Sequence, residues 1–196
     1  MFTGIIGMGM MLSFIIDVGY GTDSCSFMNL SFSNRFGLSL GTCMLLTNLV
    51  LFIPEVLWGR KLIGLGTIAN MTLIGYTSDI CRALIARYLP TFIFTQQPYR
   101  TLIFVLALIP FLIFASCYMN ADMGQAPYDA IPTILSQKLP LPYAPIRMAW
   151  DFLAIAMGIL AGGKPTPATI VLSLTIGPSV TFFGKLIFRK SGPSKS

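Results

Sequence analysis

The feature that most constrains the fold of this chain is a series of six apolar segments, each close to the length that crosses a bilayer as a helix. They cover residues 2–16, 38–57, 67–88, 102–119, 146–161 and 168–188. Charged residues make up only 10% of the chain, whereas soluble domains average about 25%. The pattern predicts an all-α, polytopic membrane bundle of about six transmembrane helices, with the lipid bilayer as a partner.

The positive charge of the chain is scattered along it. The net charge is +6, and no basic run is longer than two residues, as at Arg60-Lys61 and Arg189-Lys190. Such charges are typical of membrane topology signals, so we predict no nucleic-acid partner. With the N-terminus in the cytoplasm, seven basic residues lie inside and five outside, which favours this orientation.

The lack of histidine limits the chemistry that this chain can perform. It contains no histidine, and its four cysteines form no Cys-x-x-Cys pair. Ser-His-Asp and Cys-His catalysis and histidine-ligated metals are therefore excluded, and the cysteines are interpreted as buried free thiols. We predict that the protein is not an enzyme and has neither a metal nor a cofactor.

An internal repeat relates the two halves of the chain. An acid, one residue and a glycine follow an apolar segment at 17–19 and again at 122–124, and the two acids lie 105 positions apart. A link at 64–75 corresponds to 165–177, with Thr67 aligned with Thr169 at a separation of 102. Three spans per half place the second half upside down relative to the first. We predict one membrane domain (1–196) made of two three-helix inverted repeats (1–97 and 98–190) and a disordered tail (191–196).

The two acid-x-Gly turns carry the candidate ligand site. A helix that breaks inside a bilayer must line a cavity or be buried in protein, and a short helix after the break points its N-terminal amides at a polar group. A second interpretation stays open, in which the turns end ordinary spans at the headgroups and Asn70 bonds a neighbouring helix. The predicted ligand-binding residues are Asp17, Gly19, Gly21, Asn70, Asp122, Gly124, Pro127 and Asp129.

Charged residues near or inside apolar segments receive separate interpretations. Arg147 and Asp151 are four positions apart and share one helix face, which predicts an intramembrane ion pair. Such a pair is a functional candidate, and the alternative is a purely structural pair or an arginine that reaches the interface. Glu55, close to Arg60 and Lys61, is interpreted as part of an interface belt.

Three motifs in a fixed order connect the chain with a known family. ADMGQAPYD at 121–129 is similar to an Ala-Asp-Leu-Gly-x-x-Pro-Trp-Asp turn, and FGLSLGT at 36–42 to a Thr-Gly-Leu-Ser-Phe-Gly-Thr string. GLGT at 64–67, followed by Asn70, is similar to a Gly-x-Gly-Thr link. With these motifs the chain resembles the YczE group within the YczE/YyaS/YitT set of bacterial membrane proteins. One departure occurs in the first turn, where Thr22-Asp23-Ser24 replaces the Pro-aromatic-Asp portion.

The resemblance implies an all-helical, multi-pass protein of the bacterial inner membrane, and the family has no settled activity. Our leading hypothesis is a transporter or permease for an unknown small molecule, with a polar site between the two repeats. One alternative is a substrate-capture subunit of an ATP-driven transporter, and another is a non-transporting accessory or regulatory membrane protein. A homodimer and a complex with a coupling subunit both stay open.

Overall fold

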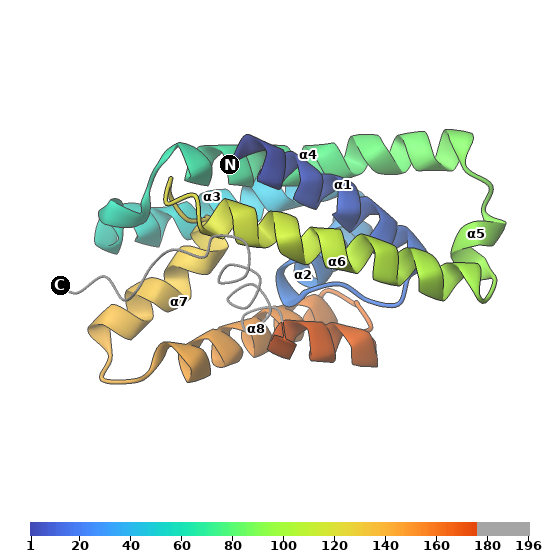
Figure 1. The fold of residues 1–196 in the computed structure, drawn as a ribbon. Helices are drawn as coiled ribbons and strands as arrows, with labels where there is room; N and C mark the ends of the chain where they lie inside the picture. Colours follow the sequence, from blue (N-terminus) through green and yellow to red (C-terminus); the bar gives the residue numbers. More distant parts are fainter. Residues whose placement is uncertain (176–196) are drawn as a thin grey trace.

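The computed structural model describes residues 1–175, which form helices joined by turns (Figure 1). This confirms the predicted all-α class. Residues 167–175 are helical, and they belong to a predicted span, 168–188, that lies mostly outside the described residues, as does the predicted tail. The other helices are α1 (Phe2–Val18), α2 (Ser24–Phe36), α3 (Leu40–Trp58), η1 (Arg60–Leu62), α4 (Leu65–Tyr88), α5 (Phe92–Thr95), α6 (Tyr99–Met119), α7 (Pro127–Lys138) and α8 (Tyr143–Leu160).

Three helices in the described part of the chain, α3, α6 and α8, are long and apolar enough to cross a membrane. α1 is also apolar, but with 17 residues it is shorter than these three helices. α4 has 24 residues and includes Asp79, Arg82 and Arg87. Apolar helices of this length are what a membrane protein requires, because a helix satisfies all its backbone hydrogen bonds within the lipid.

Two short helices, α2 and α7, follow the two acid-x-Gly turns. α2 has 13 residues, and the Asp23 carboxylate caps it by accepting a hydrogen bond from the Ser26 N–H at 3.0 Å. α7 has 12 residues and begins with Pro127, which has no N–H to leave unpaired in a first turn. Both helices are shorter than a membrane span. Each turn is therefore followed by a short helix that packs against the longer helices of the bundle.

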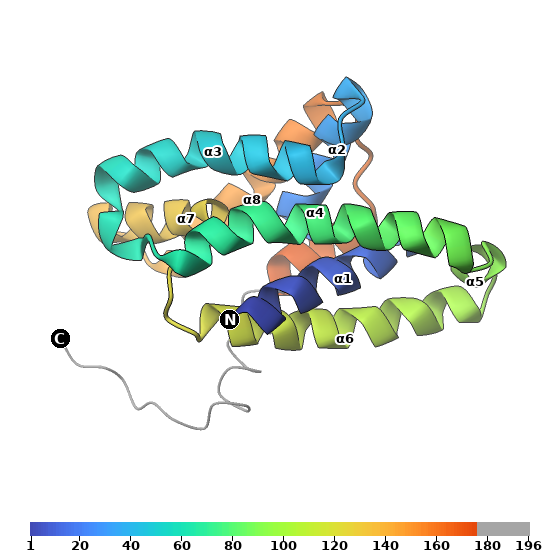
Figure 2. The ribbon, with the colours of Figure 1, turned by 90° about the horizontal axis from the view of Figure 1, so that it is seen from above.

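α1 and α6 lie side by side and antiparallel, as Figures 1 and 2 show. Near the start of α1, a Cβ atom on Gly4 would lie 2.9 Å from the carbonyl oxygen of Phe114, close to the end of α6. At the other end, Arg100 Nε donates a hydrogen bond to the Val18 carbonyl oxygen at 2.8 Å. The turns that follow α1 and α6 therefore lie at opposite ends of this helix pair.

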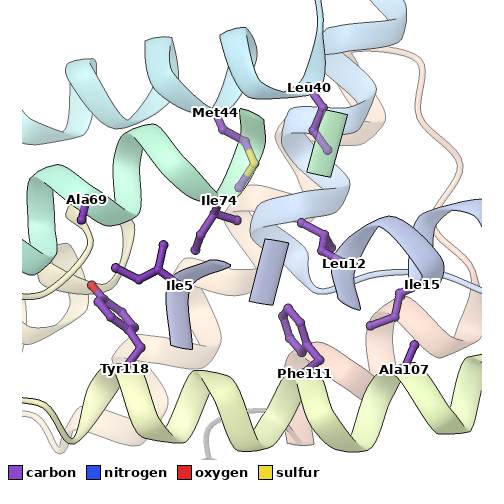
Figure 3. Packing of buried hydrophobic residues seen from close by; sticks show 10 residues of the cluster. All are labelled: Ile5, Leu12, Ile15, Leu40, Met44, Ala69, Ile74, Ala107, Phe111 and Tyr118. Atoms are coloured by element: carbon purple, nitrogen blue, oxygen red, sulfur yellow. The ribbon is translucent and has the colours of Figure 1, made fainter. Parts of the chain in front are cut away.

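The apolar core fills the space between α1, α3, α4 and α6 (Figure 3). Helices in lipid associate largely through close van der Waals packing, and interlocking side chains provide it here. The buried cluster consists of Ile5, Leu12, Ile15, Leu40, Met44, Ala69, Ile74, Ala107, Phe111 and Tyr118.

Contacts between the halves run crosswise. α2 packs on α8, and α3 packs on α7. Each short helix therefore lies against a long helix from the opposite half of the chain, and the beginnings of α2 and α7 are brought next to α8.

Candidate functional site

A cavity of about 180 Å³ lies where α2 and α7 begin. One side is apolar and is formed by core residues that Figure 3 labels, among them Leu12, Met44 and Phe111. The other side is polar and charged. Its principal polar residues are Asp23, Ser24, Asn48, Asn70, Tyr128, Asp129, Arg147 and Asp151.

An arginine held between two aspartates forms the charged side of the cavity. Arg147 Nη1 donates to Asp129 Oδ1 at 2.6 Å, and Arg147 Nε donates to Asp151 Oδ2 at 3.0 Å. Arg147 and Asp151 thus form the pair expected from their spacing on α8. The guanidinium lies 5.4 Å from the ring centre of Tyr128, which adds a cation–π contact.

Two hydroxyl groups hold the second oxygen of Asp151. Ser24 Oγ donates to Asp151 Oδ1 at 2.6 Å, and the Tyr128 hydroxyl donates to the same oxygen at 2.8 Å. These contacts join α2, α7 and α8. Because Asp151 is only 5% exposed, its charge depends on these donors and on Arg147, since a buried carboxylate without partners is costly.

The electrostatic balance of the cavity is acidic. Asp23, Asp129 and Asp151 line it together with Arg147. Burial raises the pKa of Asp23, and hydrogen bonds from Ser26 oppose that rise. Burial also raises the pKa of Tyr128 well above its usual value, so this hydroxyl keeps its proton and remains a donor. Among residues 1–175, the carboxyl groups that line the cavity therefore outnumber the positively charged groups.

The predicted ligand-binding residues are distributed over several places. Asn70 and Asp129 line the cavity with Arg147 and Asp151. Asp17 lies elsewhere and pairs with Arg82 at 2.8 Å.

Several predicted residues belong to the turns themselves. Asp122 is exposed and has a positive φ of 49°. Gly19, Gly21 and Gly124 also have positive φ, and Pro127 is buried as the first residue of α7. The structure thus brings the acid after the second turn to the cavity, whereas the acids that open the two turns lie at opposite ends of the α1–α6 pair.

Each acid-x-Gly turn packs against the link of the opposite half. At the second turn, the Gly66 N–H donates to the Met123 carbonyl oxygen at 2.7 Å, and the Gln125 N–H donates to the Leu62 carbonyl oxygen at 2.9 Å. A Cβ atom on Gly124 would lie 2.7 Å from Thr67 Oγ1, so this close approach requires glycine.

The first turn has a matching neighbour. Thr166 Oγ1 donates to the Tyr20 carbonyl oxygen, and a Cβ atom on Gly21 would lie 2.6 Å from Thr169 Oγ1. Thr67 and Thr169 are the residues that the sequence repeat aligns. A glycine therefore lies against the aligned threonine at both turns, but the first turn uses Gly21, two residues after Gly19, which is the residue that aligns with Gly124.

Sequence reasoning missed four residues of this region. Ser24 carries no motif signal, whereas Tyr128 occupies the aromatic position of the Pro-aromatic-Asp turn. Asn48 interrupts an apolar segment, which is a signal in itself. Within the part of the chain that the structure describes, its Oδ1 atom is buried without a hydrogen-bond partner. The interpretation of Glu55 as an interface residue is wrong, because it is 0% exposed.

The reason for the burial of Glu55 is the packing of α7 on the end of α3. One turn after Glu55, a Cβ atom on Gly59 would lie 2.5 Å from Ile134 Cδ1 of α7. The order of polar and apolar residues along α3 does not by itself indicate that another helix covers this position.

The fold and the cavity define a class of helical proteins that combine membrane-length apolar helices with a partly buried ion network. The chain belongs to a family of unknown function, DUF6198, which it matches over residues 1–185. It is also similar to an uncharacterized protein of Haemophilus influenzae, with 25% identity over 130 residues. That alignment covers 65% of this chain and 56% of the relative, so it spans little more than half of the relative's length. No solved structure matches the chain.

Proposed function

We propose that the protein is a multi-pass permease of the bacterial inner membrane that binds a small organic solute in the cavity between its two halves. The observation that carries this proposal is the Arg147 network with Asp129 and Asp151, set opposite an apolar wall in one cavity. Ionisable groups inside a membrane protein are costly, and they commonly line a solute or ion pathway.

An inverted repeat supports the proposal. When two halves are related by a twofold axis, every contact between them must recur with the halves exchanged. The packing of α2 on α8 has its counterpart in the packing of α7 on α3. A glycine at each turn also lies against the aligned threonine of the other half, although Gly124 aligns with Gly19 and the contact of the first turn is made by Gly21. Transporters built from such repeats bind their solutes between them. The resemblance to the YczE group agrees with this architecture.

The dimensions and charge of the cavity favour a particular class of solute. A dry cavity of about 150 Å³ holds benzene, so the 180 Å³ observed here accommodates a body of that size with a small polar head. The acidic balance and the unpaired Asn48 Oδ1 both favour a head that donates hydrogen bonds and carries positive charge. The proposed solute is therefore a small organic ammonium ion with an apolar body.

Two probe molecules with the same aromatic ring, one cationic and one anionic, test whether the site prefers a positively charged solute. We expect benzylamine to bind the purified protein in detergent, measured by titration calorimetry, and benzoate to bind more weakly. Asp129→Asn removes a charged acceptor worth about 1.5–3 kcal/mol, so the dissociation constant for benzylamine should rise roughly ten- to hundredfold.

The matched control is Asp17→Asn, which removes the same charge outside the cavity and should leave benzylamine binding unchanged. Equal binding of the two probes, or equal loss in both variants, would contradict the proposed solute site. Exchange of labelled benzylamine across proteoliposome membranes then tests transport, and binding without exchange would identify a capture subunit.

A further inference from the structure

Glu55 is a buried carboxyl group that has no hydrogen-bond partner in the described part of the chain. Both of its oxygens are buried and unpaired among residues 1–175, and the residue is 0% exposed. It lies near the end of α3, where α7 packs against that helix. The Arg147 network does not include it.

An unpaired charge in such a place is costly. A buried ionised carboxylate without a partner costs several kcal/mol, and proteins avoid this cost by neutralising the group. A metal ion requires several oxygen ligands, whereas a proton requires one oxygen. We propose that Glu55 is a proton-binding site and that it carries a proton in this conformation.

The ionisable groups around Glu55 agree with a neutral side chain. The negative charge of Asp129 on α7 would repel a negative charge on Glu55. An anionic Glu55 would add a second negative charge beside Asp129, whose own charge is already paired with Arg147.

The basic groups on the neighbouring elements are engaged or exposed. Arg60 of η1 donates to the Val56 carbonyl oxygen at 2.9 Å, and Lys61 is exposed. Lys138 of α7 lies 4.3 Å from the ring centre of Trp58.

On the remaining helices packed against α3, the charged groups lie toward its other end. Asp79 of α4 accepts a hydrogen bond from the Gly41 N–H at 2.8 Å, and Arg82 of α4 pairs with Asp17. Arg35 of α2 is exposed in the last turn of that helix.

Proton binding at Glu55 couples a proton gradient across the membrane to transport, and this step rests on the proposed function. A cationic solute beside Asp129 favours ionisation of Glu55. When α3 and α7 separate, the O–H bond of Glu55 breaks and the proton passes to water. On the other side of the membrane the cation leaves Asp129, Glu55 takes a proton from water there, and the two helices pack again. The expected exchange is one proton for one organic cation.

The proton can be observed directly, because Glu55 is the only glutamate in the chain. Cell-free synthesis with ¹³C-carboxyl glutamate labels this one side chain in the wild-type protein. In infrared spectra at pH 7, the isotope-shifted band should be that of a carboxylic acid. A labelled band of a carboxylate would overturn the proposal.

Glu55→Gln retains the size of the side chain and should lose the protonated-acid band, whereas the control Asp17→Asn should retain it. In proteoliposomes, a pH gradient should accelerate benzylamine flux in the wild type beyond the flux in protein-free liposomes, and Glu55→Gln should show only the protein-free flux. A protonated Glu55 with flux that ignores the gradient would overturn the exchange. A protonated Glu55 without benzylamine binding would overturn the proposed function alone, and a carboxylate with benzylamine binding would overturn this inference alone.

Discussion

At the scale of single residues, the structure depends on glycines where two backbones meet. Gly124 has a φ of +105°, and a Cβ atom there would meet Thr67 Oγ1 at 2.7 Å. Gly37 also has a positive φ, of +67°, but no atom of the described residues lies within 4 Å of its Cβ position. The two glycines therefore compare a position that has a positive φ alone with one that has a positive φ and close packing.

We predict that Gly124→Ala destabilises the protein much more than Gly37→Ala does. The left-handed conformation alone costs an alanine about 1–2 kcal/mol, which is the whole effect expected at position 37. At position 124 the contact with the link adds the cost of overpacking, typically about 1–3 kcal/mol. Thermal unfolding in detergent, followed by tryptophan fluorescence, measures both. Equal melting temperatures for the two variants would show that the contact with Thr67 contributes nothing.

The residues of the site were only partly predictable from the sequence. Arg147 and Asp151 could be predicted because a spacing of four on one helix is a local property. Asp129 followed from its place in a turn motif. The burial of Glu55 and the joint role of Ser24 and Tyr128 depend on which helices meet across the halves, and neighbouring residues along the chain carry no information on that.

At the scale of elements, the hydrogen bonds to Asp151 connect three helices, α2, α7 and α8. Ser24 and Tyr128 both donate to the same oxygen of this carboxylate. Either donor can satisfy that atom when the other is removed. Their contributions to stability are therefore coupled.

We predict that Tyr128→Phe and Ser24→Ala each lower the free energy of unfolding by about 1 kcal/mol. The double variant should lose more than the sum of the two, because it leaves a buried carboxylate oxygen without either donor. A double-mutant cycle from unfolding data measures this coupling, which commonly reaches 0.5–3 kcal/mol for residues in one network. Strict additivity would contradict the shared role of the two hydroxyls.

The elements themselves were largely predictable, because long apolar runs mark α1, α3, α6 and α8. The polar stretches after the two turns were also visible, and they became α2 and α7. Their pairing was not predictable, since α2 could pack on any long helix with a compatible face. Only the whole structure shows that it lies on α8.

At the scale of the whole molecule, the proposed inverted repeat makes a testable statement about sidedness. Lys138 lies against Trp58, so the end of α7 and the end of α3 are at the same end of the bundle. Lys61 follows in η1, next to the end of α3. Lys164, after α8, belongs to the opposite end, because α8 begins just after Lys138 and runs away from it (Figure 1).

We predict that single cysteines at positions 61 and 138, in a cysteine-free background, are labelled by a membrane-impermeant maleimide from the same side of the membrane. A cysteine at position 164 should be labelled from the opposite side. Spheroplasts and inverted vesicles give the two sides. Labelling of positions 61 and 138 from different sides would exclude the inverted arrangement.

Each acid-x-Gly turn packs against the link of the other half, so the order in which the chain is synthesised determines when these contacts can form. During synthesis, Gly21 emerges from the ribosome 148 residues before Thr169, the residue on which its turn rests. The contact between this turn and the second link therefore cannot form until residue 169 has left the ribosome. A chain whose synthesis stops directly after α8 lacks this contact, and its first turn stays without the link against which it packs.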